Sequence, residues 1–356
     1  MNKQWSLSIT LTVVVWALLF MAPLALDEWT VSQFGQYLTY GILAMSLSFI
    51  WGQVGILCFG QAIFFGLGAY LMALTTLEKF TWFGGSQVMG LLLATAGPAI
   101  AAYILGKLLF VGRGLSGAFF AIVTLCAAVV VEIIAQRIDF IGGFDGLLGV
   151  PPLFAGWRGG DMMTTNEMFY VVLLSALAIY LLALFVQRSP LGAVLAGIRN
   201  NEVRTASFGY RTTDYKVMAF TFSGAMAGYA GALFTAQFGF VSPAIIGTAL
   251  STEVLIWVAV GGRAVLLAAF LGVILVRWVE SVLSSTLGPY WLLTLGGLFI
   301  LTVIAMPDGI FGRLFKLPLP RAWRRFSSAQ TGAEDAARPS ANAPAVANSE
   351  IRKANA

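Results

Sequence analysis

The sequence predicts an all-α, polytopic transmembrane helix bundle with about ten spans and both termini in the cytoplasm. The chain of 356 residues is 59% hydrophobic and only 10% charged, whereas typical soluble domains are about 25% charged. Its mean hydropathy is +0.85. Its charged residues gather between apolar stretches, and a helix needs about 20 such residues to cross the hydrocarbon core of a bilayer. We therefore expect an integral membrane protein.

The apolar stretches define the individual spans. Ten occur, at about 7–26, 35–51, 56–77, 87–110, 117–136, 167–187, 214–238, 248–262, 263–285 and 289–306. The second and third run together through a stretch rich in Gly and Gln, and the eighth is short. The pattern thus leaves a count of eight to ten spans, and it does not decide whether 248–262 crosses fully.

Charges in the loops predict the orientation, because basic residues are enriched on the cytoplasmic side. Lys107, the basic segment 188–216 and Arg263 all fall inside when the ten-span count is used with Lys3 inside. The loop 137–166 is net acidic and falls outside. Every informative loop is therefore consistent with ten spans.

Three regions are expected along the chain. Residues 1–34 hold a first span, interpreted as uncleaved because its apolar run is long for a signal peptide, and an outer loop. Residues 35–316 form the main transmembrane domain. Residues 317–356 form a cytoplasmic tail that is basic at first and then, because it lacks large apolar residues, expected to be disordered.

The sequence lacks the residues of several chemistries. It contains no histidine, which removes the commonest general base and metal ligand. It has no G-x-x-x-x-G-K-[ST] phosphate loop, no catalytic Ser/His/Asp set and no Cys-x-x-Cys. Cys58 and Cys126 lie in apolar runs and are interpreted as core residues, not a disulfide pair. We expect a transport subunit, not an enzyme, with no metal or cofactor and no nucleic acid partner.

Polar residues within spans are candidates for a solute path. Gln53, Gln61 and Thr124 are neutral hydrogen-bonding groups, although each could instead connect helices. Glu253 is followed by Trp257 one turn later and then by a Gly-Gly break. An interrupted helix exposes backbone groups that transporters use to hold solutes, so Glu253 and Trp257 join the candidates.

Other charged residues within the predicted spans also have structural explanations. Arg277 and Glu280 lie three residues apart on one helix face, and a structural pair is favoured. Glu132 lies near the outer end of its span and could extend to the interface. Intramembrane charges are costly, so each remains a functional candidate.

The basic segment between the spans 167–187 and 214–238 is predicted to be a docking surface. Its length and composition indicate a short helix outside the bilayer. Because the chain has no energy-transducing chemistry of its own, a partner must supply it. The residues assigned to coupling are Arg199, Asn200, Asn201, Glu202, Ala206 and Gly209.

Several blocks together resemble the membrane permeases of bacterial ABC importers for branched-chain amino acids and urea. They are Gly-Gln-Val-Gly at 52–55 with Phe-Gly-Gln-Ala-Ile-Phe-Phe-Gly-Leu-Gly-Ala-Tyr at 59–70, 115–125, Gly-Gly-Phe-Asp-Gly-Leu at 142–147, Ser-Pro-Leu-Gly at 189–192 with Ile-Arg-Asn-Asn-Glu at 198–202, and Pro-Asp-Gly-Ile-Phe-Gly at 307–312. The resemblance covers about 35–315. Gln61 is a departure, since many relatives carry histidine there.

Within that family, Trp-Val-Ala-Val-Gly-Gly-Arg at 257–263 looks most similar to the urea-type permeases. The resemblance therefore implies inward translocation of urea or a related short amide, with a branched-chain or other hydrophobic amino acid as the alternative. It also implies a bacterial inner membrane location and alternating access driven by partners. These are a second permease in a heterodimer, two cytoplasmic ATP-binding subunits that use the ATP, and a periplasmic solute-binding protein.

Two other classes of protein are disfavoured. A passive channel needs no coupling segment, whereas 188–216 has the features of one. A proton-driven transporter needs titratable relays at depth, and the sequence offers few buried carboxylates and no histidine.

Overall fold

The structure, a computed structural model, describes residues 2–79, 85–110, 117–153, 163–287, 290, 293–294, 296–297 and 309–312. The chain divides into two units, one of Met1–Leu7 with Leu317–Ala356 and one of Ser8–Lys316. The account below concerns the second unit. The predicted tail 317–356 and most of the predicted span 289–306 lie outside the described residues.

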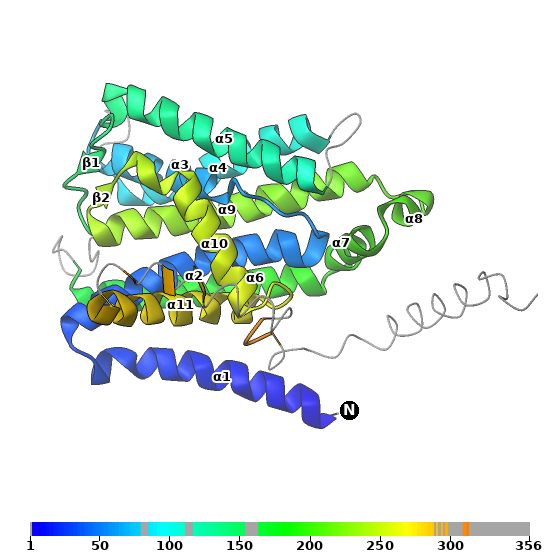
Figure 1. Ribbon diagram of the computed structural model, residues 1–356, viewed down its shortest axis with the longest axis horizontal. Coiled ribbons are helices and arrows are strands. Elements are labelled where there is room, and N and C mark those ends of the chain that lie inside the picture. The colour runs from blue at the N-terminus through cyan, green and yellow to red at the C-terminus, as the bar shows by residue number, and fades with distance from the viewer. Residues whose placement is uncertain are drawn as a thin grey trace, which may run out of the picture. The chain divides into compact units, whose positions relative to one another are not determined.

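The described residues form helices almost throughout (Figure 1). They are α1 (Asn2–Ala25), α2 (Glu28–Val54), α3 (Gln61–Thr76), α4 (Gln87–Phe110), α5 (Ala118–Arg137), α6 (Thr165–Arg188), α7 (Pro190–Asn200), α8 (Glu202–Ser207), α9 (Thr212–Phe238), α10 (Thr248–Gly261) and α11 (Leu266–Leu287), with short 3-10 turns η2 (Asp139–Ile141) and η3 (Pro243–Ile245) and strands β1 (Leu147–Leu148) and β2 (Phe240–Val241). The predicted all-α class is therefore confirmed, apart from this single two-stranded pairing.

Six described helical segments are long and apolar enough to cross a membrane: 87–110, 119–137, 165–188, 212–238, 243–261 and 266–286. Segments 10–24 and 61–76 are apolar but shorter. The predicted count of about ten spans and the cytoplasmic location of both termini are therefore not confirmed. At about 1.5 Å per residue, α10 alone covers only about 21 Å. Together with the preceding turn η3 it forms the segment 243–261, which is long enough to span.

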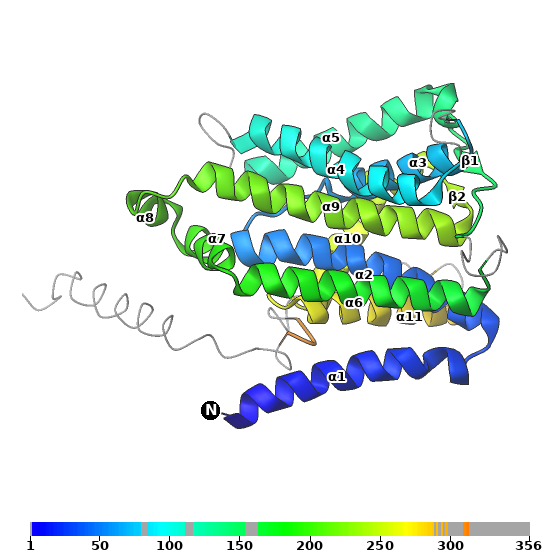
Figure 2. The ribbon, with the colours of Figure 1, turned by 180° about the vertical axis from the view of Figure 1, so that it is seen from behind.

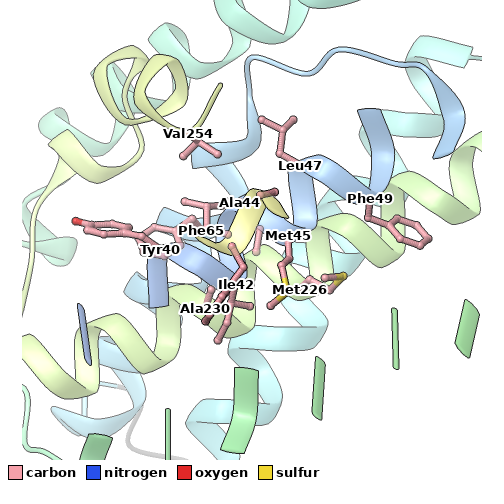
Figure 3. Packing of buried hydrophobic residues seen from close by; sticks show 14 of the residues in the cluster. Tyr40, Ile42, Ala44, Met45, Leu47, Phe49, Phe65, Met226, Ala230 and Val254 are labelled. Carbon is pink, nitrogen blue, oxygen red and sulfur yellow. The ribbon is translucent and has the colours of Figure 1, made fainter. Parts of the chain in front are cut away.

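Helices α2 and α9 form the centre of the bundle. Figure 2 shows α9 between α4 and α2, with α6 on the other side of α2. Met226 and Ala230 of α9 pack against Ile42 and Met45 of α2, as Figure 3 shows. The two longest central helices thus share one continuous core.

Glycines allow α9 to approach α3 closely. A Cβ atom on Gly231 would collide with the main-chain carbonyl of Phe65, and one on Gly68 would collide with the backbone of Gly228. Small residues at helix contacts are typical of packing in lipid. The glycines at these contacts are therefore explained by close helix packing.

Two helix breaks lie where the Gly-rich turns predicted them. Helix α2 ends at Val54, Gly55 adopts a left-handed conformation with φ +79°, and residues 55–60 run without helix into α3. Figure 1 shows this extended segment running back from the α7 end of α2. Helix α10 ends at Gly261, and Gly262 has φ +131°. Both conformations favour glycine because it lacks Cβ.

The two ends of the bundle differ. At one end β1 pairs antiparallel with β2, Leu147 opposite Val241. At the other end α7 and α8 extend beyond the long helices (Figure 2). Cys58 and Cys126 are both free, as predicted, but Cys126 is exposed on α5 and is not a core residue.

Candidate functional site

A charged cluster occupies the contact between α10, α11 and α2. Arg277 donates from Nη2 to Glu253 Oε2 at 2.8 Å and from Nη1 to Glu280 Oε2 at 3.0 Å. Its guanidinium carbon lies 4.8 Å from the centre of the Trp257 ring and 4.9 Å from that of Tyr40. One cation thus joins three helices by two ion pairs and two cation–π contacts.

The cluster includes two predicted path residues and enlarges the predicted Arg277–Glu280 pair. Trp257 is buried, with its ring 5.2 Å from that of Tyr40. Glu253 instead retains 43% of its side-chain exposure. Sequence reasoning placed Arg277 with Glu280 but missed its bond to Glu253 and missed Tyr40 entirely. The separation of 24 residues hides the first, and Tyr40 stands within an apolar run that gives no signal.

Gln61 is a buried connector of three helices. Its Nε2 donates to Ser46 Oγ of α2 at 2.8 Å and to Ser223 Oγ of α9 at 2.8 Å. The side chain is 1% exposed. This geometry favours the interhelical role over contact with a solute, although Gln61 remains a predicted path residue.

Two predicted path residues lie near the break before α3: Gln53 precedes it on α2, and Thr124 of α5 bonds to it. Thr124 of α5 is buried, and its hydroxyl accepts a hydrogen bond from the main-chain N–H of Phe59 at 3.2 Å. It thus fixes the extended segment 55–60. Gln53 is half-buried in the last turn of α2. Among the described residues, the hydrogen bonds of the Arg277 cluster include neither Thr124 nor Gln53.

The predicted coupling segment forms helices α7 and α8. Pro190 begins α7, a position where its missing N–H is not needed. The buried face of α7 carries Gly192, Leu195 and Ile198. Asn201 then caps α8, because its Oδ1 accepts from the main-chain N–H of Arg204 at 2.9 Å. The two helices are therefore distinct, separated at Asn201.

Glu202 fixes α8 to the start of α9. It forms an ion pair with Lys216 and accepts from Thr212 Oγ1 at 3.2 Å. Ala206 is exposed, and Gly209 turns the chain with φ +87°. The predicted residues Glu202, Ala206 and Gly209 therefore shape the α8 tip. Asn200, the last residue of α7, is exposed.

Arg199 faces the helix break instead of the tip. Its Nη1 donates to the main-chain carbonyl of Gly52. Partial burial of the guanidinium and then the positive charge of Arg263 lower the pKa of Arg199 from its usual value. The side chain stays a cation at physiological pH, since arginine ordinarily titrates above 12.

The tip of α8 exposes apolar side chains that the sequence reasoning did not single out. Val203 is 77% exposed, Phe208 71% and Tyr210 45%. Arg204, on the same short helix, is also exposed. An apolar patch bordered by basic charge, outside the long helices, is typical of a protein-docking surface. We define Val203, Phe208 and Tyr210 as the α8 patch.

The six long apolar helical segments define the chain as a multi-pass membrane protein. The family described as "Branched-chain amino acid transport system / permease component" matches residues 30–303. The chain belongs to this family of ABC transporter permeases.

Individual relatives cover 77–94% of the chain. The high-affinity branched-chain amino acid transport system permease protein LivM of Salmonella typhimurium is 31% identical over 94% of this chain and 79% of LivM. LivH of the same organism is 22% identical over 77% of this chain and 92% of LivH. BraD of Pseudomonas aeruginosa is 23% identical over 77% and 92%. No solved structure matches the chain.

Proposed function

We propose that this chain is a permease subunit of an ABC importer for branched-chain amino acids. The likeness to LivM, 31% identity over 94% of the chain, carries the proposal. The resemblance of 257–263 to urea-type permeases rests on a short motif, whereas the amino acid relatives match along the full bundle. The alternative reading of the sequence therefore replaces urea as the favoured one.

The partners follow from the same family. An ABC permease needs ATP-binding subunits because it has no phosphate loop, and a solute-binding protein delivers the substrate. Salmonella typhimurium has both a LivM and a LivH permease that match this chain, LivM with higher identity. We infer that this chain takes the LivM position in a heterodimer with a LivH-like permease and two ATP-binding subunits.

The α8 patch is the proposed contact for an ATP-binding subunit. It is exposed, apolar and bordered by basic residues, and α7 joins it directly to the helix break through Arg199. Closure of the ATP-binding subunits would push on α7 and α8 and move the bundle between inward-open and outward-open states. That motion is alternating access.

Uptake in intact cells tests the proposal. Cells with and without this chain, and with the other transporter components present, are given labelled leucine or labelled urea. We expect cells without this chain to lose leucine uptake alone. In cells with the chain, we expect leucine uptake at constant ATP to be insensitive to a protonophore. Loss of urea uptake alone would contradict the amino acid assignment and restore the urea reading. Sensitivity to the protonophore would contradict ATP coupling.

A second arm tests the coupling assignment. Glu202→Arg would reverse the ion pair with Lys216 that fixes α8 to α9. We expect this variant to insert normally and to lose ATP-coupled uptake. The matched control is Glu28→Arg, the same change at an exposed glutamate in the first turn of α2, outside the proposed contact. Normal uptake by Glu202→Arg would show that α8 is not the coupling element.

A further inference from the structure

The Arg277 cluster contains charges of both signs at the depth of the membrane. Arg277 is the twelfth of the 22 residues of α11, so it lies about 17 Å along a helix whose rise is about 1.5 Å per residue. Glu253 is in the second turn of α10, and Glu280 is one turn beyond Arg277. Charges at this depth face either protein or water, because exposure to lipid is costly.

The described residues cover the cluster only in part. Glu253 keeps 43% of its side-chain exposure, whereas Arg277 and Glu280 keep 19% and 20%. An exposed carboxylate on a spanning helix cannot point at lipid tails. The face of α10 and α11 that carries Glu253 must therefore border an aqueous passage or a partner subunit.

A polar stripe leads from this cluster along α11. Arg277, Glu280, Ser281 and Ser284 follow one another at spacings of three, one and three residues, which places them on one helix face. Ser284 is exposed, and Ser281 is hydrogen-bonded to Tyr37 of α2. A stripe of this kind in a spanning helix suits a water-filled path better than a lipid contact.

The donor and acceptor groups match the main-chain part of an amino acid. A zwitterion requires an anion for its ammonium and a cation for its carboxylate. Glu253 and Glu280 supply two carboxylates around one guanidinium, and the Nε of Arg277 is buried without a hydrogen-bond partner among the described residues. Urea, which is neutral, needs neither charge.

The geometry points to a zwitterion-binding site, and we propose that Arg277 binds the α-carboxylate of the transported amino acid while Glu253 and Glu280 bind its α-ammonium. This assignment rests on the proposed function. The substrate enters from the exposed side of Glu253 and separates the 2.8 Å Glu253–Arg277 pair. The neighbouring Tyr40 and Trp257 rings, 5.2 Å apart, both contact the guanidinium and hold it in place.

The same charged groups account for the site both without and with substrate. Without substrate, Glu253 satisfies Arg277, so neither charge is left unpaired. With substrate, each is paired with the opposite end of the zwitterion. The site therefore exchanges one set of charge pairs for another, which keeps the charged groups satisfied while the substrate passes.

The first test uses Glu253→Gln in the complete transporter, with uptake of labelled leucine as the readout. The change keeps the shape of the side chain, and Glu280 still pairs with Arg277. Uptake should fall roughly tenfold or more, the loss expected for one charge-assisted hydrogen bond. Stimulation of ATP hydrolysis by the loaded binding protein should persist. Thr252→Val, on the neighbouring exposed position, is the control and should transport normally. Uptake by Glu253→Gln within twofold of wild type would overturn the assignment.

A second test separates recognition from a structural ion pair. The double variant Glu253→Arg with Arg277→Glu preserves opposite charges at the two positions but reverses their order. If the pair is purely structural, the double variant should take up leucine as the wild type does, which would overturn the proposal. If the site recognises a zwitterion, uptake by the double variant should be low. The complex must still co-purify with the second permease. If either variant separates the two permeases, the cluster is a subunit contact and the proposal fails.

The proposed function and this site fail in different ways. If the wild-type complex takes up no leucine, the proposed function is wrong. If the wild type transports leucine and Glu253→Gln does so equally well, only the site is wrong. Competition in the wild type by leucinamide, which lacks the carboxylate, and by 4-methylpentanoate, which lacks the ammonium, gives an independent readout. Both should compete poorly with leucine at this permease when the binding protein is bypassed, and equal competition would overturn the site.

Discussion

Arg199 of helix α7 donates a hydrogen bond to the main-chain carbonyl of Gly52, in the last turn of α2. A cation at the carbonyl end of a helix is favourable. The non-helical segment 55–60 begins three residues later, and a Cβ on Gly55 would lie 3.1 Å from Cγ of Arg199. Helix α7 is therefore joined directly to the break before α3.

This contact predicts that Arg199 transmits force from the ATP-binding subunits. In Arg199→Ala the chain should insert and assemble, but leucine uptake should fall about tenfold, because one charge-assisted hydrogen bond to Gly52 is lost. ATP hydrolysis should continue. The measurement is the ratio of transported leucine to hydrolysed ATP in proteoliposomes. Lys79→Ala, an exposed cation outside α7 and α8, should leave the ratio unchanged, and an unchanged ratio in Arg199→Ala would refute the link.

The α8 patch predicts a binding defect of a different kind. Phe208→Asp places a charge at the exposed apolar tip, and we expect the ATP-binding subunits to dissociate from the permease because a carboxylate would be desolvated in the contact. Co-purification from detergent measures this. Phe208→Leu keeps the apolar surface and should bind normally. Retention of the ATP-binding subunits by Phe208→Asp would place their contact elsewhere.

Gly231 predicts a packing defect between α9 and α3. In Gly231→Val the added carbon atoms meet the Phe65 carbonyl, so the free energy of unfolding should fall by about 1–3 kcal/mol, the usual cost of overpacking. Thermal unfolding in detergent measures the change. Ala225→Val, at a half-buried position of the same helix, controls for the added methyl groups. Equal stability of the two variants would contradict the close helix approach.

Gln61 distinguishes its predicted role in the solute path from its observed contacts. Gln61→Leu removes the hydrogen bonds to Ser46 and Ser223, and interhelical hydrogen bonds of this type contribute about 0.6–1.7 kcal/mol in membranes. We expect lower thermal stability with an unchanged KM for leucine. The opposite result, a raised KM with unchanged stability, would show that Gln61 contacts the substrate.

Much of the fold could be predicted because burial in lipid leaves a strong signal. The predicted stretch 87–110 coincides with α4, and the Gly-rich turns near 52–55 and 261–262 are helix breaks. The number of spans was less certain, because α3 and α10 are short and adjoin glycine-rich turns. Hydropathy averages over a window and cannot separate a short helix from an adjoining extended segment.

The candidate sites show the same division at the level of single residues. A helical segment between apolar stretches was recognisable from its charge, and the predicted coupling residues lie in or beside α7 and α8. The contacts that its residues make were not recognisable from the sequence: Glu202 binds Lys216, whereas Arg199 binds the Gly52 carbonyl. The same is true of Tyr40, which meets Arg277 from a helix more than 200 residues earlier in the chain.

The sequence by itself determined that the chain lies in the membrane, which of its segments are apolar helices and which family it resembles. These properties depend on composition, periodicity and local motifs, all of which are carried by neighbouring residues. Only the tertiary structure decided that Gln61 connects three helices and that Glu253, Arg277 and Tyr40 form one cluster. The physical reason is that such contacts depend on how the helices pack against one another, and packing brings together side chains whose separation along the chain carries no local signal.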